Sequence, residues 1–201
     1  MSTAKTKSFC HYYNGVLIFC LCYSIIIALR MSTGDIKTVK IRKTAVADVA
    51  TAEKIYKDAR AFMRAAGNPT QWANEYPNRD SVLDDIANGV SYVCEDGEQI
   101  LAVFMFKIGR DKTYDVIYDG EWLNNEPYAV IHRIAVAENA HGRGVAGFCF
   151  AECFDRFPNL KIDTHRDNVP MQRALERAGF KRCGIIHLEN GEERIAFQKS
   201  V

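Results

Sequence analysis

The sequence predicts an α/β fold in which helices cover both sides of a mixed sheet. Short apolar runs rich in β-branched residues indicate strands, and they alternate with longer segments in which apolar residues recur at helical spacing. Near the end of the chain, Asn190-Gly191 stands between two apolar runs and predicts a hairpin. The predicted order is a strand, two helices, three strands, a helix, a strand, a helix and the final hairpin.

Length and composition are typical of one globular domain. The chain has 201 residues, of which 48% are hydrophobic and 25% charged. Its net charge is +1 and it has no block of like charges, so we expect no nucleic-acid partner. Seven cysteines are scattered without a Cys-x-x-Cys pair or a histidine cluster at zinc spacing, which predicts reduced thiols, no metal and a cytoplasmic protein. Cys149 and Cys153 lie on the apolar face of a predicted helix, where we expect core packing.

The first 30 residues differ from the rest. Residues 16–29 form an apolar run that is shorter than the roughly 20 residues needed to span a bilayer, but that fits the apolar region of a signal peptide. Three interpretations compete: a signal peptide without an evident cleavage site, a membrane anchor, or an upstream extension before a true start at Met31. We take Met31 as the working start, so residues 31–201 form a single domain. A membrane partner is expected only if residues 16–29 act as an anchor.

The first half of the domain is expected to contain three strands and two helices. Alternating apolar residues, two helical stripes and an Asp-Gly turn indicate them. We expect an edge strand over residues 39–42, helices from Asp48 to a stop at Gly67 and over residues 79–88, and strands over residues 90–94 and 100–106.

The segment of residues 113–128 is acidic and carries four aromatic residues. An acidic, aromatic rim suits a cationic amine, because Coulomb attraction and cation-π contact act together. Tyr118 and Trp122 are therefore candidate substrate-binding residues. The alternative is a solvated hairpin whose aromatic side chains pack down onto the protein.

Residues 130–157 combine a strand, a glycine-bearing loop and an amphipathic helix without a gap. Gly142 and Gly144 let the backbone approach a ligand closely, and the first N–H groups of the helix lack partners, which favours an anion site. The loop sequence, residues 141–146, is neither Gly-x-Gly-x-x-Gly nor a P-loop, so dinucleotide and nucleoside triphosphate sites lose support. An ordinary strand-to-helix turn is the alternative.

Two motifs resemble those of the GNAT superfamily of N-acetyltransferases. The loop is similar to that family's acyl-CoA loop, Gln/Arg-x-x-Gly-x-Gly/Ala: Gly144 and Ala146 match the small positions, whereas His141 stands in the Gln/Arg place and departs from the pattern. Residues 163–180 resemble the family's later Asn-led helix, which closes with Gly-Phe. The resemblance covers about residues 39–199. It implies a mostly antiparallel central sheet of six to seven strands and acetyl-CoA as cosubstrate.

The resemblance also implies where acetyl-CoA binds. Backbone N–H groups of the loop would hold the pyrophosphate, with Arg143 adding charge, and the pantetheine arm would run beside the preceding strand. One strand amide would polarise the thioester carbonyl. The implied cofactor-binding residues are Ile134, Ala135, Val136, His141, Gly142, Arg143, Gly144, Val145, Ala146, Asn168 and Met171. In this family the segment between the first two helices helps to wall the acceptor site, which makes Trp72 a candidate substrate-binding residue; the alternative is a core plug.

Transfer to an amine requires a neutral nitrogen and hence a base. His132 is the first candidate, because it lies on the central strand and histidine titrates near neutral pH. The His-x-Ile-Ala-Val segment is similar to that of arylalkylamine acetyltransferases, in which a histidine at this place is implicated in proton transfer. Val130 stands where other members keep a glutamate. Asp163 and His165 on the polar face of the next strand are alternative catalytic candidates, and a satisfied core histidine is the alternative for His132.

The sequence leaves two functions open. The tyrosine that often protonates the leaving thiolate in this family is replaced by Leu175. One hypothesis is an N-acetyltransferase that transfers an acetyl group directly to a primary amine of a small molecule or peptide. The other is a non-catalytic acyl-CoA-binding sensor or regulatory module. The final hairpin could pair with a second copy to form a homodimer.

Overall fold

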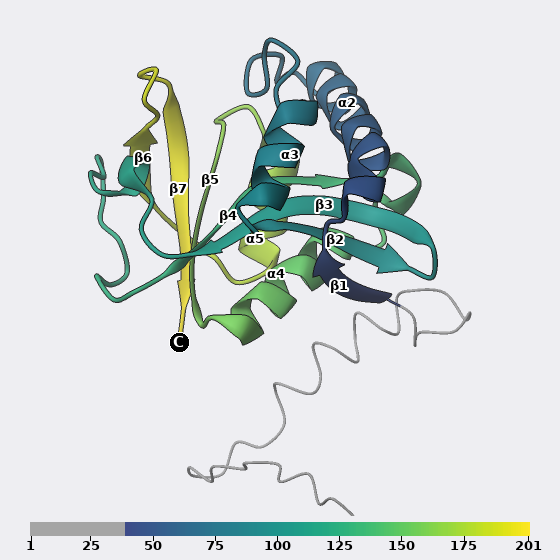
Figure 1. The fold of residues 1–201 in the computed structure, drawn as a ribbon. Coiled ribbons are helices and arrows are strands. Elements are labelled where there is room, and N and C mark those ends of the chain that lie inside the picture. The colour runs from purple at the N-terminus through teal and green to yellow at the C-terminus, as the bar shows by residue number, and fades with distance from the viewer. Residues whose placement is uncertain (1–38) are drawn as a thin grey trace, which may run out of the picture.

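Residues 39–201, which the computed structural model describes, form a mixed seven-stranded sheet with the order β1-β2-β3-β4-β5-β7-β6 (Figure 1). Neighbouring strands in this part of the chain are antiparallel except β4 and β5. The predictions for residues 1–30 and for a start at Met31 lie outside the described residues. The strands are β1 (Val39–Lys43), β2 (Ser91–Asp96), β3 (Gln99–Ile108), β4 (Ala129–Val136), β5 (Asn159–Thr164), β6 (Lys181–His187) and β7 (Glu193–Ser200).

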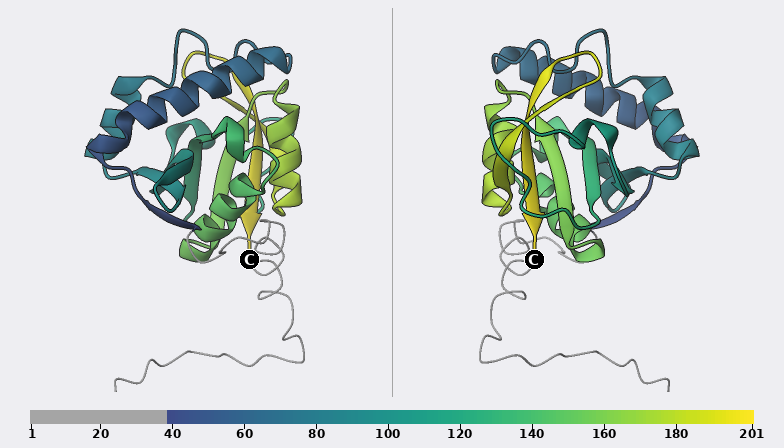
Figure 2. Two further views of the ribbon diagram at one scale, coloured as in Figure 1. Left: turned by 90° about the vertical axis from the view of Figure 1, so that its right-hand side faces the viewer. Right: turned by 90° about the vertical axis from the view of Figure 1, so that its left-hand side faces the viewer.

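The helices lie on both faces of this sheet, as predicted. In the side views of Figure 2 the blue α2 and α3 lie on one side and the green and yellow-green α4 and α5 on the other. Their bounds are α2 (Val49–Ala65), α3 (Arg79–Ala87), α4 (Val145–Arg156) and α5 (Val169–Arg177), and three short 3-10 segments are η1 (Val46–Asp48), η2 (Lys112–Tyr114) and η3 (Glu138–Ala140). Within residues 39–201 no helix combines the length and the apolar character needed to cross a membrane.

Each face of the sheet has its own core. The face under α4 and α5 packs the fully buried Phe150 and Leu175 against the strands, and Cys149 and Cys153 pack there too, as expected. The face under α2 and α3 packs Tyr56 against strand residues of β2 and β3. Burial of this much apolar surface on two faces is the main force that holds helices to sheet.

Strand β4 contains a bulge at its centre. Met105 of β3 pairs with His132 and Val103 pairs with Ala135, so two residues of β4 oppose a single residue of β3. The bulge changes the alternation of side chains along β4. Ile131, before the bulge, and Ile134, within it, therefore both pack on the α4 and α5 face.

Arg133 occupies the bulge with a φ of 52°, in the left-handed region that non-glycine residues rarely adopt. Contacts from α2, from α3 and from the loop between them hold Arg133 in this conformation. Tyr56 of α2 donates its hydroxyl hydrogen bond to the Arg133 carbonyl (2.9 Å). The Arg133 guanidinium donates to both carboxylate oxygens of Asp85 in α3, with shortest distances of 2.6 and 2.8 Å, and also to the Tyr76 hydroxyl (2.8 Å).

β4 and β5 separate just before this bulge. Within the described residues they pair at two positions, Ala129 with Leu160 and Val130 with Lys161. β5 nevertheless continues as a strand to Thr164, paired with β7. The two halves of the sheet therefore diverge after Val130, and the edge of β4 that faces β5 keeps backbone N–H and C=O groups available to a ligand.

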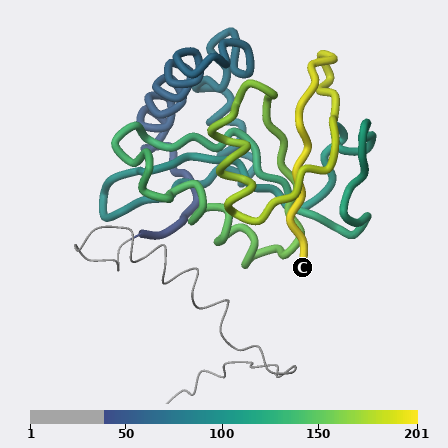
Figure 3. The backbone as a smooth tube through the Cα atoms, turned by 180° about the vertical axis from the view of Figure 1, so that it is seen from behind, coloured from purple at the N-terminus to yellow at the C-terminus, as the bar shows by residue number. Residues whose placement is uncertain are grey.

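The acidic segment before β4 is not a hairpin. It runs across β6, where the backbones of Tyr118 and Ile185 exchange two hydrogen bonds of 2.8 Å, and Figure 3 shows this teal segment beside the yellow final hairpin. A Cβ atom at Gly120 would lie 2.0 Å from the Cys183 carbonyl oxygen, so the close approach requires glycine there. Within the segment, Tyr114 is buried and Trp122 is partly buried, whereas Tyr118 is exposed. The aromatic side chains therefore fold onto the protein only in part.

Candidate active site

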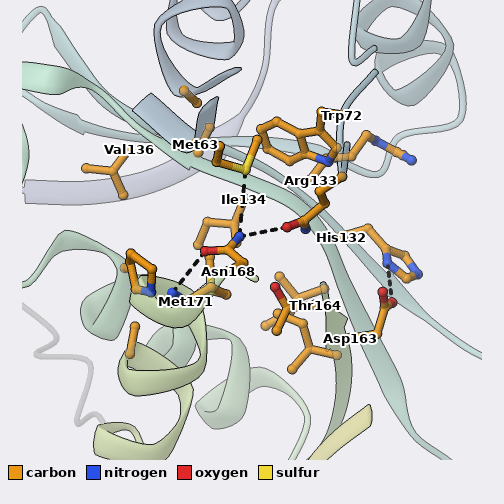
Figure 4. A pocket seen from close by; sticks show the side chains of 18 of the residues that line it. Met63, Trp72, His132, Arg133, Ile134, Val136, Asp163, Thr164, Asn168 and Met171 are labelled. Atoms are coloured by element: carbon orange, nitrogen blue, oxygen red, sulfur yellow. Dashed lines mark hydrogen bonds and ion pairs between the residues drawn. The ribbon is translucent and has the colours of Figure 1, made fainter. Parts of the chain in front are cut away.

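A cavity of about 1370 Å³ opens where β4 and β5 diverge. Its walls come from β4, from the loop that leads into α4, from β5, from the start of α5, from the loop between α2 and α3 and from the final hairpin. Figure 4 shows Ile134 and Val136 of β4 on one side, and Asn168 and Met171 of α5 on another. The volume is sufficient for an extended ligand, and segments far apart in the sequence meet around it.

The structure brings together every residue that the sequence analysis assigned to acetyl-CoA. All of them line the cavity: Ile134, Ala135, Val136, His141, Gly142, Arg143, Gly144, Val145, Ala146, Asn168 and Met171. The two loop glycines have φ values of 75° and 82°, which explains why small residues without a Cβ stand there.

The loop presents an anion site made of backbone. Gly144 caps α4 without any side-chain hydrogen bond, so the first N–H groups of this helix are free to bind a negatively charged group. His141 has a different role from the loop glycines. Its Nε2 lies 3.0 Å from the Val136 carbonyl oxygen and its ring packs edge-on against Phe62 of α2, with centroids 5.0 Å apart. His141 thus ties the loop to the end of β4.

Asn168 connects α5 to the opposite wall of the cavity. Its Oδ1 accepts from the backbone N–H of Met171 (3.2 Å), which caps α5. Its Nδ2 donates to Oε1 of Gln71 (2.9 Å) in the loop after α2, and lies 3.7 Å from the sulfur of Met63 (Figure 4). The sequence analysis did not identify Gln71, because nothing local marks it as a partner of α5.

His132 lies at another part of the cavity, between two carboxylates. Its Nε2 is 3.0 Å from Oδ2 of Asp111, and its Nδ1 is 3.6 Å from Oδ1 of Asp163, which faces it in Figure 4. The His132 side chain is 20% exposed. It lines the cavity together with Asp111 and Asp163. His132 therefore lies on the wall of the cavity and is not enclosed in the core.

Hydrogen bonds and burial determine the protonation states of Asp111 and Tyr114 beside His132. The hydrogen bond with His132, followed by those from Thr113, holds the pKa of Asp111 well below its usual range despite partial burial. Burial and the neighbouring Asp163 raise the pKa of Tyr114 well above its usual range. Tyr114 therefore stays protonated and donates to Oδ1 of Asp163 (2.7 Å). Asp111 remains an ionised carboxylate that can only accept hydrogen bonds.

The other predicted site residues separate into two groups. Trp72 lines the cavity while its ring packs edge-on against Tyr56, so it is both a wall and part of the packing over α2. His165, Tyr118 and Trp122 do not line the cavity. Tyr118 stacks on His187 at the surface, with centroids 4.7 Å apart. Trp122 covers the ammonium of Lys161 at 3.9 Å.

Tyr118 and Trp122 lie away from the cavity because of the path of their segment. It folds over β6 and β5 and not over the cleft, so composition alone did not say which way its rings would face. His165 accepts from the backbone N–H of Asp167 (3.2 Å) in the turn before α5. We assign none of the three a role in the site. Within residues 39–201 no group of histidine, cysteine or acidic side chains could hold a metal ion.

Comparison with known proteins decides the family. Residues 52–180 match the model of the Acetyltransferase (GNAT) family. The chain belongs to the GNAT acetyltransferases. It is similar to a GNAT-family acetyltransferase from Streptococcus agalactiae, with 32% identity and a TM-score of 0.75 over 81% of this chain and 95% of that one. No curated protein sequence matches the chain.

More distant GNAT structures share the fold. A GNAT-family acetyltransferase from Listeria monocytogenes is 18% identical, with a TM-score of 0.60 over 81% of this chain and 95% of that chain. The ribosomal-protein-S18-alanine N-acetyltransferase from Escherichia coli is 14% identical, with a TM-score of 0.52 over the same shares. The protein is therefore an acyltransferase of a family that uses acetyl-CoA, and the glycine loop with its open helix N–H groups fits that donor.

Proposed function

We propose that the protein is an N-acetyltransferase that transfers the acetyl group of acetyl-CoA directly to a primary amine of a small molecule or peptide. The observation that carries the proposal is His132, a basic side chain on β4 that lines the same cavity as the glycine loop. A cavity with an anion site and a candidate base suits a reaction in which a bound thioester meets an amine that must lose a proton.

The donor side uses mainly backbone. N–H groups of the loop and of the first turn of α4 bind the pyrophosphate, and the glycines keep side chains out of the way. Arg143 lines the cavity here with a side chain 37% exposed, and it adds positive charge. Ile134 and Val136 give the pantetheine arm an apolar wall, and the diverging edge of β4 offers it hydrogen bonds.

The acceptor side supplies the base. His132 takes a proton from the ammonium, the freed nitrogen lone pair attacks the thioester carbonyl carbon, and a free N–H of β4 stabilises the developing negative charge. The carbon–sulfur bond then breaks and the electron pair leaves on sulfur. Leu175 is fully buried in the core, so no tyrosine hydroxyl at that position protonates the thiolate. Protonated His132 or a water molecule supplies the proton that the thiolate takes up, and the second proton of the amine nitrogen passes to solvent as the amide forms.

A thiol-release assay over a panel of primary amines tests the proposal. Acetyl-CoA is supplied, free CoA is followed with a thiol reagent, and acetylated product is identified by mass spectrometry. Steady CoA production with at least one amine, together with the matching product, supports the enzyme. Stabilisation of the fold by acetyl-CoA without turnover on any amine contradicts it and supports the acyl-CoA sensor instead.

A further inference from the structure

Hydrogen bonds from the segment before β4 fix the orientation of the Asp111 carboxylate. It caps η2, and its Oδ1 accepts from both the backbone N–H (3.0 Å) and the hydroxyl (2.6 Å) of Thr113. The backbone N–H of Asp111 donates to the hydroxyl of Tyr128 (3.0 Å), the residue that precedes β4. These contacts satisfy one carboxylate oxygen and leave Oδ2 for the Nε2 atom of His132, 3.0 Å away.

The chemistry of the two groups decides which of them carries the proton. An ionised carboxylate accepts hydrogen bonds and cannot donate one. The short contact between Asp111 and Nε2 therefore requires a hydrogen on Nε2. In the neutral ring the lone pair is then on Nδ1, and this is the atom that can take a proton.

The surroundings of Nδ1 suit that role. Its nearest carboxylate oxygen, Oδ1 of Asp163, is 3.6 Å away, beyond direct hydrogen-bond distance, and that oxygen already accepts from Tyr114. The second Asp163 oxygen lies 4.0 Å from the guanidinium of Arg194. Asp163 is thus held in place by other groups, close enough to stabilise a positive charge on the ring while leaving Nδ1 open to a proton donor.

We propose that Asp111 is a positioning residue for His132: it accepts the Nε2 hydrogen and thereby fixes the tautomer in which Nδ1 is the basic atom of the active site. In the reaction, Nδ1 accepts the ammonium proton of the acceptor and the ring becomes an imidazolium, whose two N–H groups point at Asp111 and Asp163. This inference rests on the proposed function for its kinetic consequence, whereas the tautomer itself is a property of the free protein.

Nitrogen-15 NMR of the full-length protein, labelled at histidine, tests the tautomer without any substrate. Comparison with His132→Gln assigns the signals, and spectra at about pH 8.5 keep an ordinary histidine neutral. We expect a protonated Nε2 and a bare Nδ1 at His132 in the wild type. A protonated Nδ1 at His132 in the wild type, alone or together with a protonated Nε2, would overturn the proposal.

Asp111→Asn tests the consequence. An asparagine that keeps its oxygen on Thr113 turns its amide N–H₂ toward Nε2, which reverses the tautomer. We expect the NMR pattern of His132 to invert and kcat to fall by about 10²-fold, with the KM for acetyl-CoA within about twofold of wild type. Asp115→Asn, in the same segment but paired with Arg110 at the surface, is the matched control and keeps both the tautomer and kcat.

The outcomes separate this inference from the proposed function. An Asp111→Asn variant with the wild-type tautomer or the wild-type kcat overturns the positioning role. A wild type that shows the predicted tautomer but turns over no amine contradicts the N-acetyltransferase proposal and leaves the assignment of the ring nitrogens standing.

Discussion

At the scale of single residues, burial gives Lys161 an unusual environment. The lysine is 3% exposed, and its ammonium lies 3.9 Å from the ring centroid of Trp122 and 4.1 Å from that of Tyr128. The rings attract the charge, but removal from water disfavours it, and burial lowers the pKa of Lys161 to about 8 from 10.5. Lys161 shares the polar face of β5 with Asp163, and Trp122 and Tyr128 cover its ammonium there.

The lysine makes the stability of the protein depend on pH in a predictable direction. Between about pH 8 and pH 10.5 the unfolded chain binds more protons at this residue than the folded chain, so its contribution to stability rises with pH. Lys161→Met removes this titration. We expect the wild type to gain about 2 kcal/mol relative to the variant between pH 7.5 and pH 10, measured by urea unfolding. A pH-independent difference between the two proteins would contradict the shifted pKa.

At the scale of elements, the bulge in β4 shapes the site. Arg133 keeps a strained φ of 52° because Tyr56 of α2 and Asp85 of α3 form hydrogen bonds with it on the face that these helices cover. The bulge places Ile134 on the same face as Ile131, three residues earlier, at the point where the strand leaves β5. A helix pair on one face thus controls the backbone that lines the cavity.

Asp85→Ala tests this control. The variant leaves the Arg133 guanidinium without its carboxylate in a largely buried place, where breaking one partner of an ion pair costs about 3 kcal/mol. We expect that loss in urea unfolding, together with weaker acetyl-CoA binding by calorimetry, because the bulge is no longer held. Asp84→Ala, exposed on the same helix, serves as the control and should change neither quantity. If Asp85→Ala is destabilised but binds acetyl-CoA as the wild type does, the bulge does not shape the acetyl-CoA site and this prediction is contradicted.

Local features of these elements could be predicted from sequence, whereas contacts between distant segments could not. The glycine loop and the Asn190-Gly191 hairpin were predictable because turn chemistry is encoded within a few residues. Asp111 was missed because its contact with His132 joins segments 21 residues apart, and depends on a capping turn and on the β4 bulge. The position of Trp122 over Lys161 and away from the cavity was not predictable, because an aromatic, acidic composition does not determine which surface a segment covers.

At the scale of the whole molecule, the site exists because one parallel strand pair comes apart. β4 belongs to an antiparallel half with β1, β2 and β3, and β5 to a second half with β7 and β6. They remain joined at two residue pairs, and the cavity fills the opening beyond. Asn168 and Gln71 then link the two sides across it. Under the proposed function, the donor enters between the sheet halves and His132 on β4 meets the acceptor.

The most direct test of the central claim is kcat/KM measured against pH for the wild type and His132→Gln, with one accepted amine. We predict that the variant loses about 10²-fold in kcat/KM and that its pH profile loses the limb that the histidine base produces, with acetyl-CoA binding retained. A His132→Gln enzyme with the same profile as the wild type would remove His132 from the mechanism and contradict the account.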